Sequence, residues 1–220
     1  MDMVTLKING IEVSAPAGST ILEAARLAHI EIPTLCFLKE INEIGACRIC
    51  VVEVKGARSL VTACVYPVNE GMEVWTNTPK VIESRRKTLE LILSDHDRKC
   101  LSCVRSGNCS LQALSKAMNI QEVPFRNEAT ERPWDKTLPI LRDSSKCIKC
   151  LRCVSVCERV QSLGVWEVTG SGAHTTVRIK GGLRMNEANC ALCGQCVSHC
   201  PVGALRERDD TELVFEALCD

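Results

Sequence analysis

The sequence contains few aromatic residues and carries no excess of either charge. Aromatic residues make up 3% of the 220 residues, so something besides aromatic packing must hold the chain together. Lysine plus arginine equals aspartate plus glutamate at 27 each, which argues against a nucleic acid or an anionic membrane as the partner. A basic recognition helix is also lacking.

Signals for export, membrane insertion and nucleotide binding are lacking as well. The opening segment MDMVTLKINGIEVSAPAG has no basic region followed by an apolar run, and no stretch approaches the roughly 18 apolar residues of a membrane span. We therefore expect a cytoplasmic protein, in a reducing compartment where clustered cysteines are metal ligands rather than disulfides. No Gly-x-Gly-x-x-Gly motif follows a strand-like run and no nucleophile stands beside a base, so we expect no substrate-converting site in this chain.

Cysteine, by contrast, is abundant, and the strongest pattern among the 16 cysteines is an internal repeat. CIKCLRCVSVCERV (147–160) aligns without gaps to CALCGQCVSHCPVG (190–203). The repeat departs from the bacterial pattern once, because Glu158 stands where the second copy has Pro201. Each copy reads Cys-x2-Cys-x2-Cys-x3-Cys, and in two-cluster bacterial ferredoxins the fourth cysteine of such a run ligates the other cluster. The pattern predicts two [4Fe–4S] clusters, one held by Cys147, Cys150, Cys153 and Cys200 and one held by Cys157, Cys190, Cys193 and Cys196.

A second group of cysteines lies in the first third of the chain, with the spacing Cys36-x10-Cys47-x2-Cys50-x13-Cys64. Four thiolates on one framework suit a [2Fe–2S] cluster, although the spacing differs from the plant-type ferredoxin run. Zinc is an alternative occupant of such a set. A further alternative is that Cys64 is a buried strand residue and not a ligand.

A third group has only three cysteines in reach of one another, in the order His96-x3-Cys100-x2-Cys103-x5-Cys109. A [4Fe–4S] cluster needs four ligands, and an imidazole replaces thiolates in Rieske centres. The incomplete cysteine set therefore predicts that His96 completes a third [4Fe–4S] site.

The remaining cysteine and histidines are expected to be non-ligands. Cys219 is left over in an acidic tail, His29 falls in a predicted helix and His174 in a hairpin turn. His199 adjoins Cys200 and tunes that cluster at most, so a non-ligand role is favoured for it too.

The predicted fold class is α+β, and the first domain, residues 1–78, is predicted to be a β-grasp [2Fe–2S] ferredoxin domain. Its opening residues alternate across Asn9-Gly10, a pair that supplies the positive φ of a tight hairpin turn. A helix is predicted over 21–30, capped at Ser19 or Thr20 and ended by Ile32-Pro33. Strand-like runs follow on both sides of Lys55-Gly56 and at 72–75.

The rest of the chain is predicted to form a small helical domain and a bacterial-type two-[4Fe–4S] ferredoxin domain. Helical periodicity covers 80–96 and 111–118, and a Gly-Ser-Gly turn predicts a hairpin within 165–182. The predicted divisions are 79–119 for the His-ligated domain, 120–143 for a connector with Pro124, Pro133 and Pro139, 144–212 for the two-cluster domain and 213–220 for the tail.

The order of these motifs resembles a known group of iron–sulfur electron-transfer subunits. The same succession is similar to the N-terminal half of the complex I large iron–sulfur subunit, the accessory region of multimeric [FeFe]-hydrogenases and the diaphorase iron–sulfur subunit of NAD-linked soluble hydrogenases. All 16 ligand positions are present. The intact second repeat is most similar to the [FeFe]-hydrogenase branch, because the other two commonly lack part of it.

The resemblance implies an electron-transfer subunit of a multisubunit oxidoreductase, with one [2Fe–2S] and three [4Fe–4S] clusters. It implies two partners, a flavin-bearing NAD(P)H oxidoreductase subunit and a second redox subunit that is hydrogenase-like or formate-dehydrogenase-like. One alternative is the N-terminal portion of an [FeFe]-hydrogenase, here without the catalytic domain that follows it in that family. A non-catalytic iron–sulfur sensor is another, although sensing needs one exposed cluster and not four.

Overall fold

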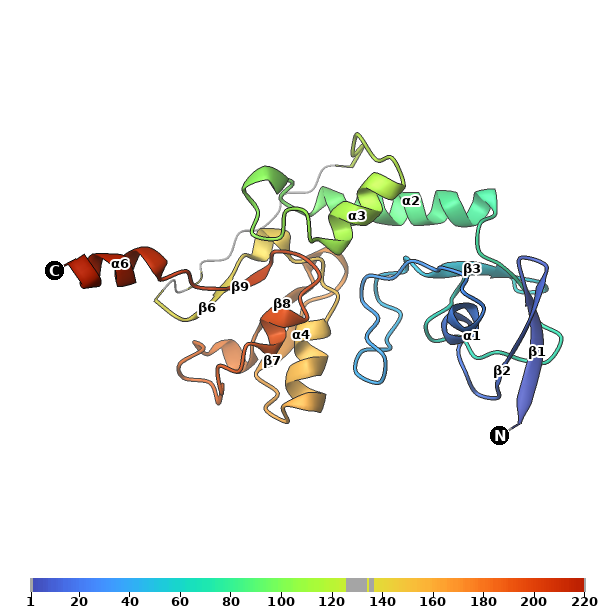
Figure 1. The fold of residues 1–220 in the computed structure, drawn as a ribbon, viewed down its shortest axis with the longest axis horizontal. Coiled ribbons are helices and arrows are strands. Elements are labelled where there is room, and N and C mark those ends of the chain that lie inside the picture. Colours follow the sequence, from blue (N-terminus) through green and yellow to red (C-terminus); the bar gives the residue numbers. More distant parts are fainter. Residues whose placement is uncertain (1, 126–133, 135–136, 220) are drawn as a thin grey trace.

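The computed structural model describes residues 2–125, 134 and 137–219, and the two ends of the chain lie at opposite ends of its long axis (Figure 1). The first domain is a five-stranded mixed sheet in the order β2-β1-β5-β3-β4. Strands β1 and β5 are parallel and the other neighbours are antiparallel. The elements are β1 (Met3–Ile8), β2 (Ile11–Pro16), α1 (Ile21–Leu27), β3 (Val51–Val54), β4 (Val61–Thr62) and β5 (Glu73–Trp75).

The predicted hairpin across Asn9-Gly10 is confirmed. Asn9 and Gly10 have φ values of 53° and 83°, the positive pair that a type I′ turn requires. The Asn9 side chain also donates to the Thr76 hydroxyl at 2.8 Å and accepts from the Thr76 backbone N–H at 2.8 Å. The turn residue therefore fixes the hairpin to the end of β5.

Helix α1 begins where the sequence predicts and ends earlier. Thr20 forms a capping box with Glu23, because each side chain accepts from the backbone N–H of the other residue. The helix ends at Leu27, and not at Ile32-Pro33, because His29 takes the left-handed conformation with φ 56°. The bonds His29 N–H to Arg26 O and Ile30 N–H to Ala25 O then close a Schellman motif. His29 therefore lies after the helix, exposed, and the prediction that placed it inside was wrong.

Helix α2 (Pro79–Ser94) runs from the sheet domain to the cysteine-rich half of the molecule (Figure 1). Thr78 caps it and Pro79 occupies its first turn, where a missing N–H costs nothing. The helix ends two residues before His96, so this histidine stands on an irregular segment and not on the helix. A 3₁₀ turn (Cys100–Ser102) and helix α3 (Ser110–Ala117) follow.

The last domain contains two small sheets and the two cysteine repeats. Strand β6 pairs with β9, and β7 pairs with β8 around a 3₁₀ turn at Gly172–His174, which confirms the predicted hairpin. Strand β6 lies inside the predicted connector, while residues 126–133 and 135–136 of that connector, Pro133 included, are outside the described residues. The elements are β6 (Ile140–Arg142), a 3₁₀ turn (Ser144–Lys146), α4 (Arg152–Ser155), a π-helical turn (Val156–Val160), β7 (Trp166–Thr169), β8 (Thr176–Ile179), a 3₁₀ turn (Lys180–Gly182), α5 (Gln195–Ser198) and β9 (Leu205–Glu207).

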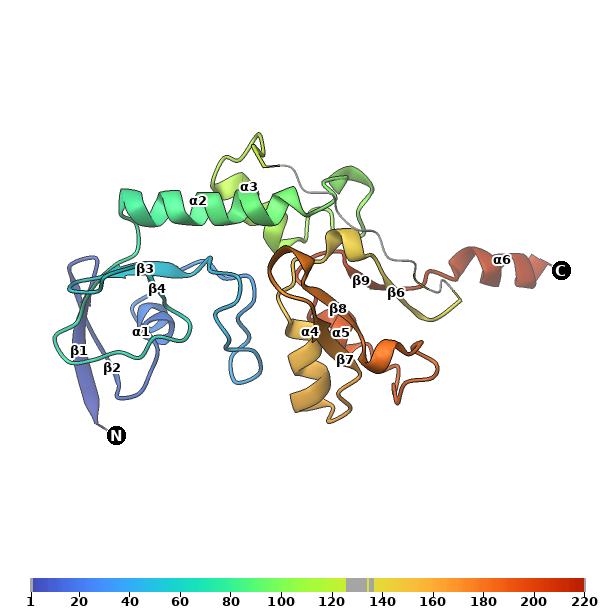
Figure 2. The same ribbon diagram turned by 180° about the vertical axis from the view of Figure 1, so that it is seen from behind.

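The C-terminal segment is helical where the sequence predicts a tail. Helix α6 (Thr211–Cys219) extends away from the rest of the molecule, as both views show (Figure 2). Four of its apolar side chains are more than half exposed: Leu213, Val214, Phe215 and Leu218. Within the described part of the chain, no helix has the length and apolarity that crossing a bilayer requires.

Candidate functional site

The four cysteines of the first domain lie together on loops that flank the sheet. Cys36, Cys50 and Cys64 are buried and Cys47 is half-buried. A hydrogen bond with Cys36 lowers the pKa of Cys47 to about 6, and the same bond raises the pKa of Cys36. A hydrogen bond with Cys64 likewise lowers the pKa of Cys50, while the pKa of Cys64 is raised. The structure therefore brings this predicted ligand set together.

His96, the histidine of the middle group, has a buried ring nitrogen without a partner. Nδ1 of His96 is the one buried side-chain nitrogen or oxygen in the described residues that lacks a hydrogen bond. Burial lowers the pKa of His96, against an opposing contact with the Lys146 backbone, so its imidazole is held neutral. Cys100, Cys103 and Cys109 are half-buried on the loop that follows. A neutral imidazole with a free nitrogen is the state in which histidine binds a metal.

The middle loop is packed against the second cysteine repeat. The Ser110 N–H donates to the Pro201 carbonyl at 3.1 Å. A Cβ atom added to Gly203 would stand 2.7 Å from Sγ of Cys103, closer than atoms of side chains approach. Glycine at this position therefore lets the Cys103 sulfur touch the backbone just beyond Cys200.

The two cysteine repeats fold alike at their start. Lys149 and Leu192, at equivalent positions, have φ values of 55° and 52°, and Leu151 and Gly194 have φ values of 63° and 72°. Each pair of left-handed residues bends its loop ahead of a short helix, α4 or α5. The sequence repeat is therefore a structural repeat as well.

The repeats differ around their fourth cysteine, Cys157 or Cys200. The first copy continues into the π-helical turn that contains Glu158, whereas Pro201 follows the end of α5 in the second. Proline has no N–H and cannot continue a helix, so Pro201 prevents the second copy from continuing as the first copy does.

The predicted crossing of ligands between the repeats agrees with the positions of the thiols. Cys147, Cys150 and Cys153 of the first copy line one small cavity together with Cys200 of the second. Burial, together with the charges of Cys200 and Cys147, raises the pKa of Cys150 to about 12. Cys200 is therefore brought to the first three-cysteine loop.

The second set is grouped in the same crossed way. The pKa of Cys196 is raised to about 11, because burial and the charges of Cys190, Cys157 and Cys193 outweigh the lowering effect of a hydrogen bond from Trp166. The Val165 N–H donates to Sγ of Cys157 at 3.3 Å. Within the described residues no three histidine, cysteine or carboxylate side chains converge as they would around a single ion. A cluster spreads its ligands over several irons, so sulfurs surround it at wider spacing.

Some residues around these groups were not found from the sequence. Asn42 is fully buried and donates from its amide to the carbonyls of Cys36 and Cys150. Trp166 stacks on Trp134, with ring centroids 6.0 Å apart, in addition to its bond with Cys196. No local spacing in the sequence marks Asn42 or Trp166 as a neighbour of the cysteine groups.

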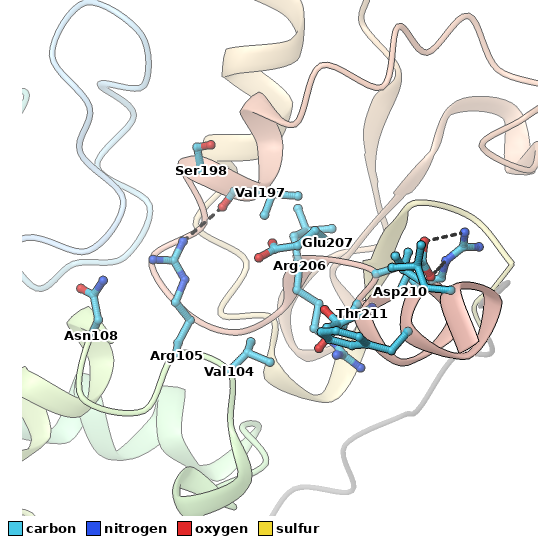
Figure 3. Close-up of a pocket in the computed structure, with 15 residues that line it drawn as sticks. Val104, Arg105, Asn108, Val197, Ser198, Arg206, Glu207, Asp210 and Thr211 are labelled. Atoms are coloured by element: carbon cyan, nitrogen blue, oxygen red, sulfur yellow. Dashed lines mark hydrogen bonds and ion pairs between the residues drawn. The ribbon is translucent and has the colours of Figure 1, made fainter. Parts of the chain in front are cut away.

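A groove of about 1030 Å³ opens between the middle loop, α5 and α6 (Figure 3). Arg105 points across it and donates to the Val197 carbonyl at 3.3 Å. On the other side, Arg208 and Asp210 form an ion pair at the start of α6. The groove therefore borders both the loop of the middle cysteines and the helix that carries Cys196.

Three family models match successive parts of the chain. Residues 1–79 match the 2Fe-2S iron-sulfur cluster binding domain. Residues 85–124 match the NADH-ubiquinone oxidoreductase-G iron-sulfur binding region, and residues 146–204 match the 4Fe-4S dicluster domain.

Similar proteins combine the same parts in one chain. The chain is 42% identical to the NADP-reducing hydrogenase subunit HndD of Solidesulfovibrio fructosivorans, over 100% of this chain and 39% of that protein. It is 35% identical to the NADPH-Fe(3+) oxidoreductase subunit alpha of Geobacter sulfurreducens, over 92% of this chain and 24% of that protein. The chain thus spans less than half the length of these curated relatives.

A solved structure matches nearly the whole fold. A chain of an NAD+-reducing [NiFe]-hydrogenase in the H2-reduced state superposes with a TM-score of 0.86 at 28% identity, over 93% of this chain and 87% of that one. Successive segments of the chain thus match iron–sulfur cluster binding families, and the chain as a whole is similar to iron–sulfur subunits of NAD(P)-linked hydrogenases and related oxidoreductases.

Proposed function

We propose that the chain holds one [2Fe–2S] and three [4Fe–4S] clusters. The [2Fe–2S] ligands are Cys36, Cys47, Cys50 and Cys64. The [4Fe–4S] ligand sets are His96, Cys100, Cys103 and Cys109; Cys147, Cys150, Cys153 and Cys200; and Cys157, Cys190, Cys193 and Cys196.

The observation that carries this proposal is the single cavity that Cys147, Cys150, Cys153 and Cys200 line together. A bound group that needs four sulfurs explains why the chain brings a cysteine across from the second repeat. The unpartnered Nδ1 of His96 supports the middle site in the same way, because a buried polar atom without a partner costs free energy unless a ligand satisfies it. The residues therefore fit the clusters, which supply one-electron chemistry when bound.

We assign these clusters to the divisions expected from the sequence. Residues 1–78 are a β-grasp domain, 79–119 the His-ligated domain, 120–143 a connector, 144–212 a two-[4Fe–4S] ferredoxin domain and 213–220 a tail. The parallel pairing of β1 with β5, with β3 beside β5, supports a β-grasp topology for the first of them. The pairing of β6 with β9 supports including 140–142 in the last domain.

Within this arrangement the clusters relay electrons between two other polypeptides. One is a flavin-bearing NAD(P)H oxidoreductase subunit, and the other is a second redox subunit that is hydrogenase-like or formate-dehydrogenase-like. The printed names of the relatives, an NADP-reducing hydrogenase subunit and an NADPH-Fe(3+) oxidoreductase subunit, support this pair of partners. The Asn42 link between the first and last domains supports a continuous route. We place the assembly in the cytoplasm.

An alternative function is the front portion of a longer hydrogenase. It is favoured by the observation that HndD matches the whole of this chain with only 39% of its own length. In that case the second redox site belongs to the same polypeptide and not to a partner subunit.

The relay is tested with the native assembly isolated through this chain. Adding NADH or NADPH under argon is expected to bleach the visible absorbance of the clusters in the assembly, whereas the isolated chain is reduced only by dithionite. Reduction of the isolated chain by NAD(P)H would place a nucleotide site on this polypeptide and contradict the proposal. So would an assembly whose clusters respond to dithionite and never to NADH, NADPH or hydrogen.

A further inference from the structure

Arg85 is a charged side chain buried in the interface between α2 and β3. Only 7% of it is exposed. Its guanidinium donates twice to the Val51 carbonyl, from Nε at 3.2 Å and from Nη2 at 2.7 Å. A carbonyl satisfies two of its five N–H groups and none of its charge, and a buried charge without a counter-charge is costly.

No carboxylate supplies that counter-charge among the residues that the structure describes. The ion pairs of α2 lie elsewhere: Arg86 with Glu90 at 3.0 Å and Lys87 with Glu83 at 2.6 Å. No ion pair includes Arg85 in the described chain. Arg85 therefore differs from Arg86 and Lys87, its neighbours on the helix, each of which has a carboxylate partner.

The negative group that does act on Arg85 is Cys50. Burial lowers the pKa of Arg85, and the charge of the Cys50 sulfur is the influence that opposes it. The geometry agrees, since Val51, whose carbonyl binds the guanidinium, directly follows Cys50 in the chain. An arginine stays protonated even when buried, so a fixed positive charge faces this cysteine.

We infer that Arg85 is the buried counter-charge of the [2Fe–2S] cluster and raises its reduction potential, a role that rests on the function proposed above. A [2Fe–2S] cluster with four thiolates is anionic, and its reduction adds one electron and no proton. A fixed cation in a poorly screened interior stabilises the extra negative charge more than the oxidised state. Arg85 therefore acts as a fixed charge near the cluster, and it neither donates nor accepts electrons itself.

A purely structural role is the competing explanation, because the two bonds to Val51 also join α2 to the sheet. Charge and hydrogen bonding are separated by two variants. Arg85→Gln keeps a donor and loses the charge, whereas Arg85→Lys keeps the charge with fewer donors. Lys87→Gln removes a charge from an exposed position of the same helix and serves as the matched control.

The test is a redox titration of the purified, cluster-loaded full chain, followed by the EPR signal of the reduced [2Fe–2S] cluster. Arg85→Gln is expected to lower the equilibrium constant for reduction of the cluster about tenfold, which is a fall in its reduction potential of about 59 mV for one electron. Arg85→Lys is expected to stay close to the wild type, and Lys87→Gln to match it. Equal potentials in the wild type and Arg85→Gln, or an equal fall in Arg85→Gln and Arg85→Lys, would overturn the inference.

If a variant is unstable, the amount of [2Fe–2S] cluster that it holds is compared in place of its reduction potential. Loss of the [2Fe–2S] signal in Arg85→Gln with retention in Arg85→Lys supports the charge, and loss in both overturns it. A wild-type chain that binds iron and sulfide but gives no [2Fe–2S] signal contradicts the proposed function itself. This result is obtained on the wild-type chain alone, so failure of the proposed function is distinguished from failure of the inference about Arg85.

Discussion

The side-chain amide of Asn42 donates to the backbone carbonyl of Cys150 at 3.0 Å, across 108 positions of the chain. The same amide donates to the Cys36 carbonyl at 2.7 Å, and its oxygen accepts from the Ser155 hydroxyl at 2.7 Å. Arg152 adds bonds to the carbonyls of Cys36 and Phe37. One fully buried side chain thus holds a proposed [2Fe–2S] ligand and a proposed [4Fe–4S] ligand in fixed relation.

Replacing Asn42 by alanine is expected to loosen this junction. It leaves two carbonyls and a hydroxyl without partners, which costs on the order of 2–4 kcal/mol. We expect the variant to lose its visible cluster absorbance faster on heating, and its [2Fe–2S] EPR signal to broaden less through the neighbouring [4Fe–4S] spin. Asn77→Ala, at an exposed position, is the control. Unchanged bleaching and unchanged broadening would show that the junction does not depend on Asn42.

Replacing His96 by cysteine is expected to lower the potential of the middle cluster. A thiolate brings a negative charge that the neutral imidazole lacks, and the two ligand types differ by on the order of 100 mV or more in other iron–sulfur centres. An EPR redox titration of the reduced protein measures the shift, with the exposed His174→Cys as the control. An unchanged titration would remove His96 from the ligand set.

Gly203→Ala is expected to disturb the middle cluster from a distance along the chain. The new Cβ would stand 2.7 Å from the Cys103 sulfur, so the loop must shift at a cost of about 1–3 kcal/mol. We expect altered g-values for the cluster of Cys100, Cys103 and Cys109, with the other EPR signals kept. Ser106→Ala, an exposed change in the same loop, is expected to alter none of them. Wild-type spectra in Gly203→Ala would mean that the two loops are not in contact.

Trp166→Phe is expected to lower the potential of the cluster of Cys157, Cys190, Cys193 and Cys196. The hydrogen bond from Trp166 to Cys196 stabilises negative charge on the sulfur, and phenylalanine keeps the ring while losing the N–H. Trp134→Phe is the matched control, since the Trp134 N–H goes to the Ile140 carbonyl at 2.8 Å. A redox titration that separates the [4Fe–4S] signals measures this potential in each variant. Equal shifts of the potential in Trp166→Phe and Trp134→Phe would contradict the role of the Trp166 hydrogen bond.

Local sequence signals predicted the local structure well. Asn9-Gly10 predicted its hairpin and Thr20 its cap, because both act through bonds to residues close by. The cysteine repeat predicted which thiols gather, since ligand spacing is itself a structural constraint. His29 escaped prediction, because a non-glycine residue in the left-handed conformation leaves no mark in the sequence.

Contacts between segments that lie far apart in the chain could not be predicted from the sequence. Asn42, Arg85 and Gly203 each act on a residue far along the chain, and neither periodicity nor spacing reports such a pairing. Helix α6 was missed for a different reason. Its apolar residues follow an acidic stretch that reads as solvated surface, and no cap or glycine marks its end.

The most direct test of the four-cluster account is the amount of iron and acid-labile sulfide per chain in anaerobically purified protein, with EPR on the reduced sample. The account predicts about 14 iron atoms and one [2Fe–2S] signal beside the [4Fe–4S] signals. About ten iron atoms would mean that one [4Fe–4S] site does not form, with the His96 site the first to be re-examined. Zinc with little sulfide would contradict the electron-relay function altogether.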